Sequence, residues 1–393
     1  MPIRSYKTEL HPNNKQITMF NKHAGCARFT YNWALGMLNA DYLKRKQDEE
    51  FHLSHRKLNG EPDYTAKDIK EYRKSMSCNY IQISAITLHK ILNSKKSSEF
   101  PWMRECSKWA AQNALYNIES AFKNFFRGQK NYPKFKKKND KDSFTLDNPV
   151  VVGDSWIQLP KIGKVKLYEK NYLPIGRPKS ATVSKRGGRW FVSVRYETQT
   201  INPIWSDEII GVDLGIKSLI TCSDGTIVKN SSKLKELEDS LKRLQRKFTK
   251  QIKGSKSSDK TKLKIQKLHF RISNSRKDVL HKTTSMLAKT KQHGTIVIED
   301  LNVKGMMKNH KLAKAISNCG FYEFRRQLEY KCLWYGKKLI IANRFFPSSK
   351  TDHKTGEYIE NLKLSDRIIY HIDGTHTDRD LNAAINLKNY SEL

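Results

Sequence analysis

Helical spacing dominates the first third of the chain, after one short strand pattern at its start. Residues 3–9 alternate weakly between apolar and polar positions, which predicts a strand. From about Asn13 the pattern turns helical, residues 103–127 give the clearest helix, and residues 50–80 are polar and predict a helix–loop–helix region with little core. The apolar residues that define the two helix faces are Phe29, Trp33, Met37 and Ala40 in the first, and Leu115, Ile118, Phe122 and Phe125 in the second.

A change of pattern at Pro133 introduces a series of short strands. Residues 143–197 contain several short apolar runs, and Gly187-Gly188 marks a tight turn between two of them. The runs are Val150–Val152, Trp156–Leu159, Val165–Leu167, Ala181–Val183 and Trp190–Val194. They predict a small β-barrel or curved sheet, with the helical block 11–127 inserted between its first strand and the rest.

The second half of the chain has the pattern of a separate α/β unit. Buried strands are predicted at Ile209–Val212 and Thr295–Ile298, because both are short apolar runs. Between them we expect two long basic helices, near 233–252 and 260–292, and the polar break at 254–259 predicts that they form an antiparallel hairpin. The other expected elements are strands at Leu219–Cys222, Thr226–Val228 and 338–342, a helix at 311–337 and a terminal helix from about Asp380.

The charge balance makes a nucleic acid the expected partner. The chain of 393 residues carries 74 Lys+Arg against 39 Asp+Glu, a formal net charge of +35. Such an excess repels itself unless a polyanion shares the structure, and phosphates neutralise Lys and Arg while releasing counterions. A soluble basic protein and a membrane-surface binder are the alternatives. The mean hydropathy of −0.72 is low, but a hydrophobic content of 37% is sufficient for a folded core.

Membrane and disulfide signals are both missing from the sequence. Apolar runs such as Ile296–Ile298 have only the length of a strand, and the start Met1–Arg4 lacks the apolar stretch of a secretory signal. The six cysteines form no CxxC pair, so free, mostly buried thiols are expected. We therefore expect a cytoplasmic, nucleoid-associated protein without membrane contact.

Basic clusters supply candidate contacts to a phosphate backbone. The run 134–138 places a phenylalanine among lysines, which suits phosphates and a stacked base, although a solvated loop has the same composition. The charged faces of the two long helices are open to the same two interpretations. The candidate contacts are Lys134, Lys136, Lys137, Lys138, Arg177 and Lys179.

Three carboxylates are the candidates for chemistry. Asp213 and Glu299 each follow a buried strand, and Asp380 stands at the start of the last helix. Ligands bind at such strand ends in open α/β sheets. Two divalent metal ions about 4 Å apart can activate water and hold the departing oxygen during phosphodiester hydrolysis, and hard Mg²⁺ prefers oxygen ligands. Each acid alone has a simpler explanation, since Asp380 could be only a helix N-cap. The set of three is informative.

The acids lie in segments that resemble the motifs of a RuvC nuclease domain. Those segments are Ile210–Gly215, Ile296–Leu301 and Asp378–Ala384. Arg344–Lys350 is similar to the segment before the zinc-binding insert of TnpB proteins, and the helix around Gln112–Leu115 and the run Tyr132–Lys136 also match that family. The resemblance covers nearly the whole chain. The sequence is therefore identified as a member of the TnpB family of transposon-encoded, RNA-guided endonucleases, which are related to type V CRISPR effectors.

The resemblance implies a fold, a reaction and partners. It implies an RNase H-like RuvC core, a β-barrel wedge domain and an inserted helical recognition lobe. The implied activity is Mg²⁺-dependent DNA cleavage next to a short motif, with two ions held by Asp213, Glu299 and Asp380, Asp378 in reserve and Mn²⁺ able to substitute. A guide RNA from the transposon end, double-stranded target DNA and a monomer in the RNA complex are implied as well. The expected segments are 1–10 and 128–206 for the wedge, 11–127 for the recognition lobe, 207–346 and 374–393 for the nuclease, and 347–373 for the insert.

The insert departs from the family pattern. Relatives carry two CxxC pairs that bind zinc, and aligned positions here hold Asp352, Thr355, Tyr370 and Asp373. No zinc site is therefore expected. A rebuilt metal site is conceivable because of the nearby histidines, but we expect surface histidines in an insert held by apolar packing. The histidines are His353, His371 and His376, and the apolar residues are Tyr358, Ile359, Leu362, Leu364, Ile368 and Ile369.

Two other functions remain open at this stage. The chain could be a cleavage-deficient, RNA-guided DNA-binding protein that represses or marks its targets. It could also be a transposase accessory protein, or a transposase that acts on its own ends. Retention of all three acids favours the nuclease, because an inactive relative is expected to lose at least one.

Overall fold

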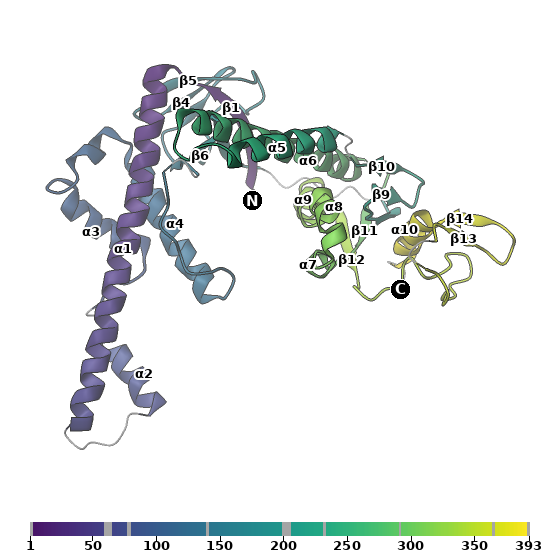
Figure 1. Ribbon diagram of the computed structural model, residues 1–393, viewed down its shortest axis with the longest axis horizontal. Helices are drawn as coiled ribbons and strands as arrows, with labels where there is room; N and C mark the ends of the chain where they lie inside the picture. Colours follow the sequence, from purple (N-terminus) through teal and green to yellow (C-terminus); the bar gives the residue numbers. More distant parts are fainter. Residues whose placement is uncertain are drawn as a thin grey trace. The chain divides into compact units, whose positions relative to one another are not determined.

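The computed structural model describes residues 3–58, 65–76, 80–138, 141–198, 206–230, 233–290, 292–363 and 366–390 (Figure 1). Of these, residues 3–198 form one compact unit, and the described residues from 206 to 390 form the other. Leu364, one of the residues expected to pack in the insert, lies outside the described residues.

The N-terminal unit begins with a strand and continues with a block of helices. α1 is a single helix of 45 residues, and α2 begins with a capping box in which the side chains of Thr65 and Asp68 satisfy free backbone amides. The elements in order are β1 (Ile3–His11), α1 (Asn14–Leu58), α2 (Ala66–Ser75), α3 (Ala85–Lys96), a 3₁₀ helix (Pro101–Glu105) and α4 (Lys108–Phe126).

The remaining strands of this unit join β1 in a seven-stranded sheet with the order β2-β6-β7-β1-β5-β4-β3. β1 pairs with β7 from Ile3 to Leu10 and with β5 at Leu10 and His11. No pairing between β2 and β3 closes the sheet among the described residues, so the predicted closed barrel is corrected to an open sheet. The added strands are β2 (Ser143–Leu146), β3 (Val151–Val152), β4 (Trp156–Leu159), β5 (Gly163–Leu167), β6 (Ser180–Arg186) and β7 (Arg189–Glu197).

Helices and sheet of the N-terminal unit share one hydrophobic core. Phe20 of α1 lies against Phe144 of β2 and Trp190 of β7, with ring centroids 6.0 and 5.0 Å apart. The predicted face of α4 is confirmed, since Leu115, Ile118 and Phe122 are buried.

The predicted face of α1 is wrong by part of a turn. Phe29, Trp33 and Met37 are only half-buried, and Ala40 is exposed. The aromatic residues lie at the rim of the core, where Phe29 packs edge-on against Phe100 and Trp102. The buried hydrophobic residues of α1 are Phe20, Ala24, Cys26, Ala27, Tyr31, Ala34, Leu35 and Leu38, and the polar residues His23 and Thr30 are buried beside them.

The C-terminal unit is built on a five-stranded sheet with the order β10-β9-β8-β11-β12. β8, β11 and β12 run parallel, whereas β9 pairs antiparallel with β8 and with β10. The strands are β8 (Ile209–Asp213), β9 (Ser218–Cys222), β10 (Ile227–Lys229), β11 (Thr295–Glu299) and β12 (Lys338–Ala342). The unit is therefore mixed α/β.

Alternation along the parallel strands gives this sheet two covered faces. Ile210, Val212 and Ile298 pack on one face against residues of α6 and α9. Val297 packs on the other face against Leu387 of α10. The covering helices are α6 (Lys256–Lys289), α9 (Phe321–Tyr335) and α10 (Arg379–Asn389).

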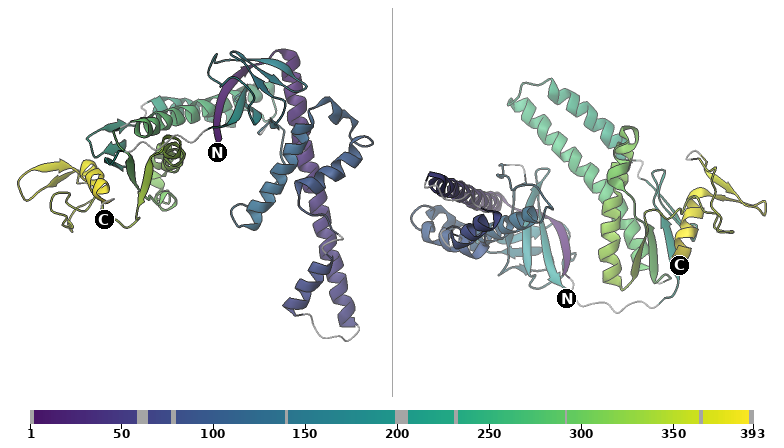
Figure 2. Two further views of the ribbon diagram at one scale, coloured as in Figure 1. Left: turned by 180° about the vertical axis from the view of Figure 1, so that it is seen from behind. Right: turned by 90° about the horizontal axis from the view of Figure 1, so that it is seen from below.

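The predicted helical hairpin is confirmed as α5 (Lys233–Thr249) and α6, which lie antiparallel in the right-hand view of Figure 2. The helix predicted over 311–337 is instead two helices, α8 (His310–Cys319) and α9, after the short α7 (Val303–Met306). Gly320 separates them at a φ of +66°, a conformation that glycine adopts at low cost and that ends a helix.

A buried lysine joins α6 to α9. Lys331 is 4% exposed, and its Nζ donates to the carbonyl of His281 and to the hydroxyls of Thr284 and Ser285 at 2.6–2.9 Å. Burial lowers the pKa of Lys331 to about 8.

Cysteine and membrane expectations can be compared with the described residues. The cysteines Cys26, Cys106, Cys222, Cys319 and Cys332 are all free and buried. No helix among the described residues is long and apolar enough to cross a membrane.

Candidate active site

The sheet register brings Asp213 and Glu299 to the same edge. Val212 of β8 pairs with Ile298 of β11, so the two acids are the next residues along adjacent parallel strands. Adjacent strands lie about 4.8 Å apart, and equivalent positions of parallel strands point to the same face. Asp213 follows Gly211 by two residues on β8, so both point to the face of the sheet that α10 covers, and Glu299 points to the same face.

Asp380 reaches the same place because α10 lies directly on β8. A Cβ atom added at Gly211 would be 2.0 Å from the carbonyl oxygen of Ala384 and 2.4 Å from the amide nitrogen of Lys388. Asp380 precedes Ala384 by one helical turn on the same helix face, and Asp213 follows Gly211 by two residues on the same strand face. Close packing at a glycine thus aligns the two carboxylates.

The three carboxylates influence one another electrostatically. Burial raises the pKa of Asp213 well above its ordinary value, and the charges of Glu299 and Asp380 raise it further. Burial also raises the pKa of Glu299, although a hydrogen bond from Ser348 and the charge of Arg379 act against it. The nearby arginine does not compensate for the buried like charges, so a cation bound at this edge would be stabilised.

Several neighbours of the acids were not singled out from the sequence. Ser348 Oγ donates to Glu299 Oε1 at 2.5 Å, and Arg367 Nη1 lies 3.8 Å from Asp380 Oδ1. Ser348 and Arg379 occur in segments that resemble family motifs, but no spacing rule assigns them a role. Their contribution depends on tertiary packing alone.

The reserve acid Asp378 has a structural role. Its side chain accepts hydrogen bonds from the amides of Asp380 at 2.9 Å and Leu381 at 3.3 Å, so it is the N-cap of α10. Asp380 lies in the first turn, with its carboxylate one quarter exposed. The capping role considered for Asp380 therefore belongs to Asp378.

The candidate nucleic-acid contacts of the N-terminal unit differ in whether their side chains already have partners within the protein. Lys134, Lys137, Lys138 and Arg177 are exposed. The Lys136 ammonium lies over the ring of Tyr31, 3.9 Å from its centroid, and Lys179 is ion-paired with Glu197. All six residues are exposed, but these two lysines also have partners within the protein.

The insert contains a polar interior instead of the predicted apolar packing. His371 is buried and not a surface residue, whereas His353 is half-buried and His376 exposed. Among the aligned zinc positions, Asp352 is buried, and Thr355, Tyr370 and Asp373 are exposed. Of the apolar residues expected inside, Ile369 is buried, Ile359 and Leu362 are half-buried, and Tyr358 and Ile368 are exposed.

Profiles of known protein families match three parts of the chain. The profile described as "Probable transposase" matches residues 191–310, and "Cas12f1-like, TNB domain" matches residues 321–387. A profile described as "Helix-turn-helix domain" matches residues 1–47, where the described residues form β1 and the first part of the single helix α1.

Curated relatives match along almost the whole chain. "Putative RNA-guided DNA endonuclease" of Streptomyces pristinaespiralis is 33% identical, over 98% of this chain and 88% of the relative. "Putative RNA-guided DNA endonuclease InsQ" of Escherichia coli K12 is 29% identical, over 98% and 91%. A relative from Mycobacterium tuberculosis is 30% identical, over 99% and 87%.

Solved structures with distant similarity include a Cas12f1–sgRNA–target DNA complex, with 15% identity and a TM-score of 0.36 over the full length of both chains. A CRISPR–Cas12f ternary complex has 15% identity and a TM-score of 0.38, over 95% of this chain and 82% of that one.

The profile matches cover separate segments of the chain and indicate a class of transposon-encoded proteins. Its identity to curated relatives over nearly full length shows the narrower group, and the chain belongs to the TnpB family.

Proposed function

We propose that the chain is an RNA-guided DNA endonuclease with an RNase H-like RuvC core. The observation that carries the proposal is the meeting of Asp213, Glu299 and Asp380, from two strands and one helix, at a sheet edge where burial and their like charges raise the pKa of Asp213. Relatives named as RNA-guided endonucleases support the same reaction.

The donor set fits Mg²⁺. Carboxylate oxygens are the ligands that this hard cation prefers, and three acids from different elements suffice because the ion keeps several waters. When bound, two such ions supply an activated water and stabilise the departing 3′ oxygen, and Mn²⁺ can substitute. Ser348 holds the Glu299 carboxylate in a fixed orientation, and Arg367 and Arg379 add positive charge where a phosphate would approach.

The hairpin of α5 and α6 supports a nucleic-acid partner. From residue 246 to 267, every charged side chain except Asp259 is Lys or Arg. These basic residues are exposed, and none of them forms an ion pair within the described part of the chain. Nearer the sheet the hairpin is compensated, because Glu238 binds both Arg276 and Lys314. The hairpin tip, residues 246–267, therefore carries uncompensated positive charge, which a phosphate backbone would neutralise.

The position of this tip within its unit suits that partner. α6 runs parallel to α9, because Arg276 bonds Asn318 just before α9 begins, and Thr284, further along α6, bonds Gln327, further along α9. α9 leads into the start of β12, so its first residues lie at the level where the strands end and the acids stand. The twenty residues of α6 before Arg276 extend about 30 Å further, on the side of the carboxylates. A nucleic-acid duplex bound to the hairpin tip would therefore lie on the same side of the sheet edge as the carboxylates.

Cleavage and binding assays test the proposal. We expect the purified protein to carry RNA, and with Mg²⁺ to nick a plasmid that contains the matching target. Asp213→Ala and Glu299→Ala should each lower the cleavage rate by roughly 10³-fold or more, while RNA and target binding remain within about twofold. Asp278→Ala is the matched control, because this acid is exposed and its ion pair within the described residues is with Lys282, one turn along α6.

The possible failures are distinguishable. Cleavage by Asp213→Ala at the wild-type rate would contradict the assigned site. Target binding without nicking by the wild type would favour the cleavage-deficient reading, and strand transfer without RNA would favour a transposase.

A further inference from the structure

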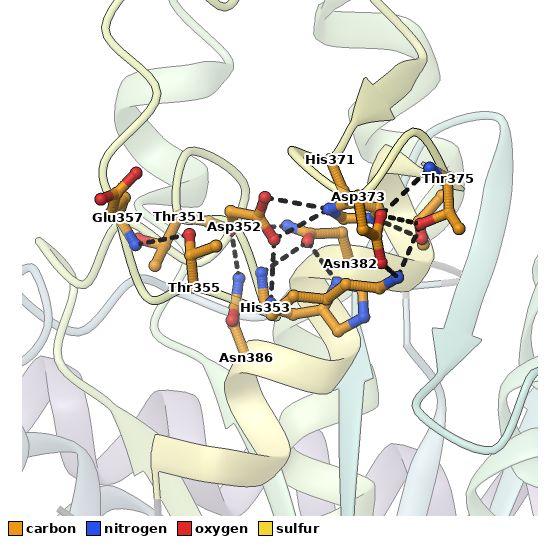
Figure 3. Close-up of polar contacts among 12 residues, drawn as sticks. Thr351, Asp352, His353, Thr355, Glu357, His371, Asp373, Thr375, Asn382 and Asn386 are labelled. Carbon is orange, nitrogen blue, oxygen red and sulfur yellow. Dashed lines mark hydrogen bonds and ion pairs between the residues drawn. The ribbon is translucent and has the colours of Figure 1, made fainter.

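Two polar pairs join the two limbs of the insert, residues 351–357 and 371–375 (Figure 3). His371 Nδ1 lies 2.9 Å from both carboxylate oxygens of Asp352, and the pair is almost completely buried. Lys354 Nζ donates to Asp373 Oδ2 and to Thr375 Oγ1, both at 2.6 Å. Each of these two carboxylates, Asp352 and Asp373, therefore has its own cationic or N–H partner.

The insert does not fit the zinc site that the family resemblance implies. Tyr370 is 77% exposed, and Thr355 is exposed as well, so two of the four aligned positions do not converge. Asp352, His353 and His371 do offer ligand atoms within 4.8 Å of one another. Both ring nitrogens of His371 are already engaged, however, because Nδ1 faces Asp352 and Nε2 bonds Thr377 Oγ1 at 2.7 Å. His353 Nδ1 is bonded to Asn382 Oδ1 at 2.8 Å. The Lys354 ammonium supplies positive charge between the limbs.

The same network continues into α10. Asn382 Nδ2 donates to the carbonyl of Thr351 at 2.7 Å, and its Oδ1 accepts from the amide of His353 at 3.0 Å. Asn386 Nδ2 donates to the carbonyls of Thr351 at 2.6 Å and Ser348 at 2.8 Å. Both asparagines are buried, and Asn382 is two residues from Asp380.

We propose that the Asp352–His371 pair is a metal-independent positioning element for the nuclease edge, an inference that rests on the proposed function. Asp352 fixes the loop that carries Thr351 and His353, this loop fixes α10 through Asn382 and Asn386, and α10 carries Asp380. Ser348, held by Asn386 through its carbonyl, orients Glu299 through its hydroxyl. The pair thus performs the joining role of a zinc ion and extends it to two of the three acids.

The physical basis is the cost of leaving a buried carboxylate without its partner. Removing the His371 ring would leave Asp352 buried and short of its N–H donor, so the loop is expected to open and hydrate. A displacement of about 1 Å at a catalytic group can cost on the order of 10²-fold in rate. The effect should appear in kcat, because both side chains are buried inside the protein and offer no surface to a guide or a target.

The test compares His371→Ala with His371→Asn in the complete RNA complex. The asparagine amide can replace the Nδ1 donor, so we expect His371→Ala to lower kcat by at least about 10-fold with KM for target unchanged, and His371→Asn to restore most of it. His376→Ala is the control, since this exposed histidine lies on β14 (His376–Asp378), which pairs with β13 (Ile368–Tyr370) of the insert. Equal kcat for His371→Ala and the wild type would overturn the proposal.

Two further measurements do not depend on cleavage. Hydrogen exchange should show faster exchange of the α10 amides in His371→Ala, but not in His371→Asn or His376→Ala, even if the wild type proves unable to cut. Elemental analysis should find far less than one zinc per chain, and a chelator specific for zinc should change neither exchange nor cleavage. Stoichiometric zinc whose removal loosens α10 would overturn the metal-independent role, and unchanged exchange in His371→Ala would overturn the positioning role.

Discussion

The carboxylates at the sheet edge and those in the insert both lie near α10, but their pKa values are shifted in opposite directions. At the sheet edge, burial and neighbouring like charges raise the pKa of Asp213. In the insert, hydrogen bonds from Lys354 and Thr375 lower the pKa of Asp373. Burial alone would raise the pKa of Asp352, but hydrogen bonds from His371 and from the backbone amide of Lys354 outweigh it and lower the pKa.

This difference in pKa direction distinguishes a ligand-binding site, at the sheet edge, from a structural cluster, in the insert. A polar cluster whose charges are matched within the protein needs no ligand, and its acids are stabilised in the folded state. A cluster of like charges is destabilising unless something binds to it, which is a mark of functional sites. Asp300 makes the same distinction within one segment, because it follows Glu299 directly but is bound by Arg325 at 2.7 Å and Arg344 at 2.6 Å.

The largest loss of stability is expected from a substitution that displaces α10, the helix that both groups of carboxylates depend on. Gly211→Ala would place a methyl group 2.0 Å from the carbonyl oxygen of Ala384, and backbone cannot move aside as a flexible side chain can. We expect the free energy of unfolding to fall by roughly 3 kcal/mol or more, with loss of cleavage. Gly36→Ala is the control, because nothing lies within 4 Å of its added Cβ and alanine favours the helix by about 1 kcal/mol. Wild-type stability of Gly211→Ala in a urea titration would contradict the packing of α10 on β8.

Single neutralisations should move stability in opposite directions. Without divalent ions, Asp213→Asn should raise the free energy of unfolding by about 1 kcal/mol, and Asp352→Asn should lower it by about 2 kcal/mol. The gain of Asp213→Asn should appear as pH rises through the raised folded pKa. The loss of Asp352→Asn should be complete above the unfolded pKa of about 3.9 and should vanish as pH falls through the lowered folded pKa. Urea titrations between pH 3 and pH 8 would measure both, and shifts of the same sign would remove the contrast.

Magnesium should stabilise only through the sheet edge. At a free concentration of ten times its dissociation constant, Mg²⁺ is expected to contribute about 1.4 kcal/mol, or a shift of about 2–4 °C in Tm. Asp213→Asn should lose this shift, and Asp352→Asn should keep it. A thermal scan with and without Mg²⁺ makes the comparison, and an equal shift in both variants would place the ion elsewhere.

Sequence patterns predicted the type of each helix and strand more accurately than the points at which the helices end. The strands before Asp213 and Glu299 follow from short apolar runs, and the Gly254–Asp259 break placed the hairpin correctly. The break at Gly320 was missed because the flanking residues continue the helical spacing, and only the backbone conformation reveals the end of α8.

The site was predictable as a set of acids but not as a geometry. Strand ends and the family motifs indicated Asp213, Glu299 and Asp380, whereas the role of Gly211 depends on a helix that arrives almost 170 residues later. The insert was misjudged because composition suggested apolar packing, and the pairing of Asp352 with His371 joins positions 19 residues apart that no periodicity connects.

The place of β1 in its sheet has a consequence for how the protein is made. The first strand of the chain lies between β7 and β5, and Ile3 pairs with Glu197. During synthesis α1 can form at once from local contacts, but β1 must wait, unpaired, until nearly two hundred residues have left the ribosome. An exposed strand edge of this kind invites association with other chains, so a factor that shields the nascent N-terminus should raise the yield of folded protein.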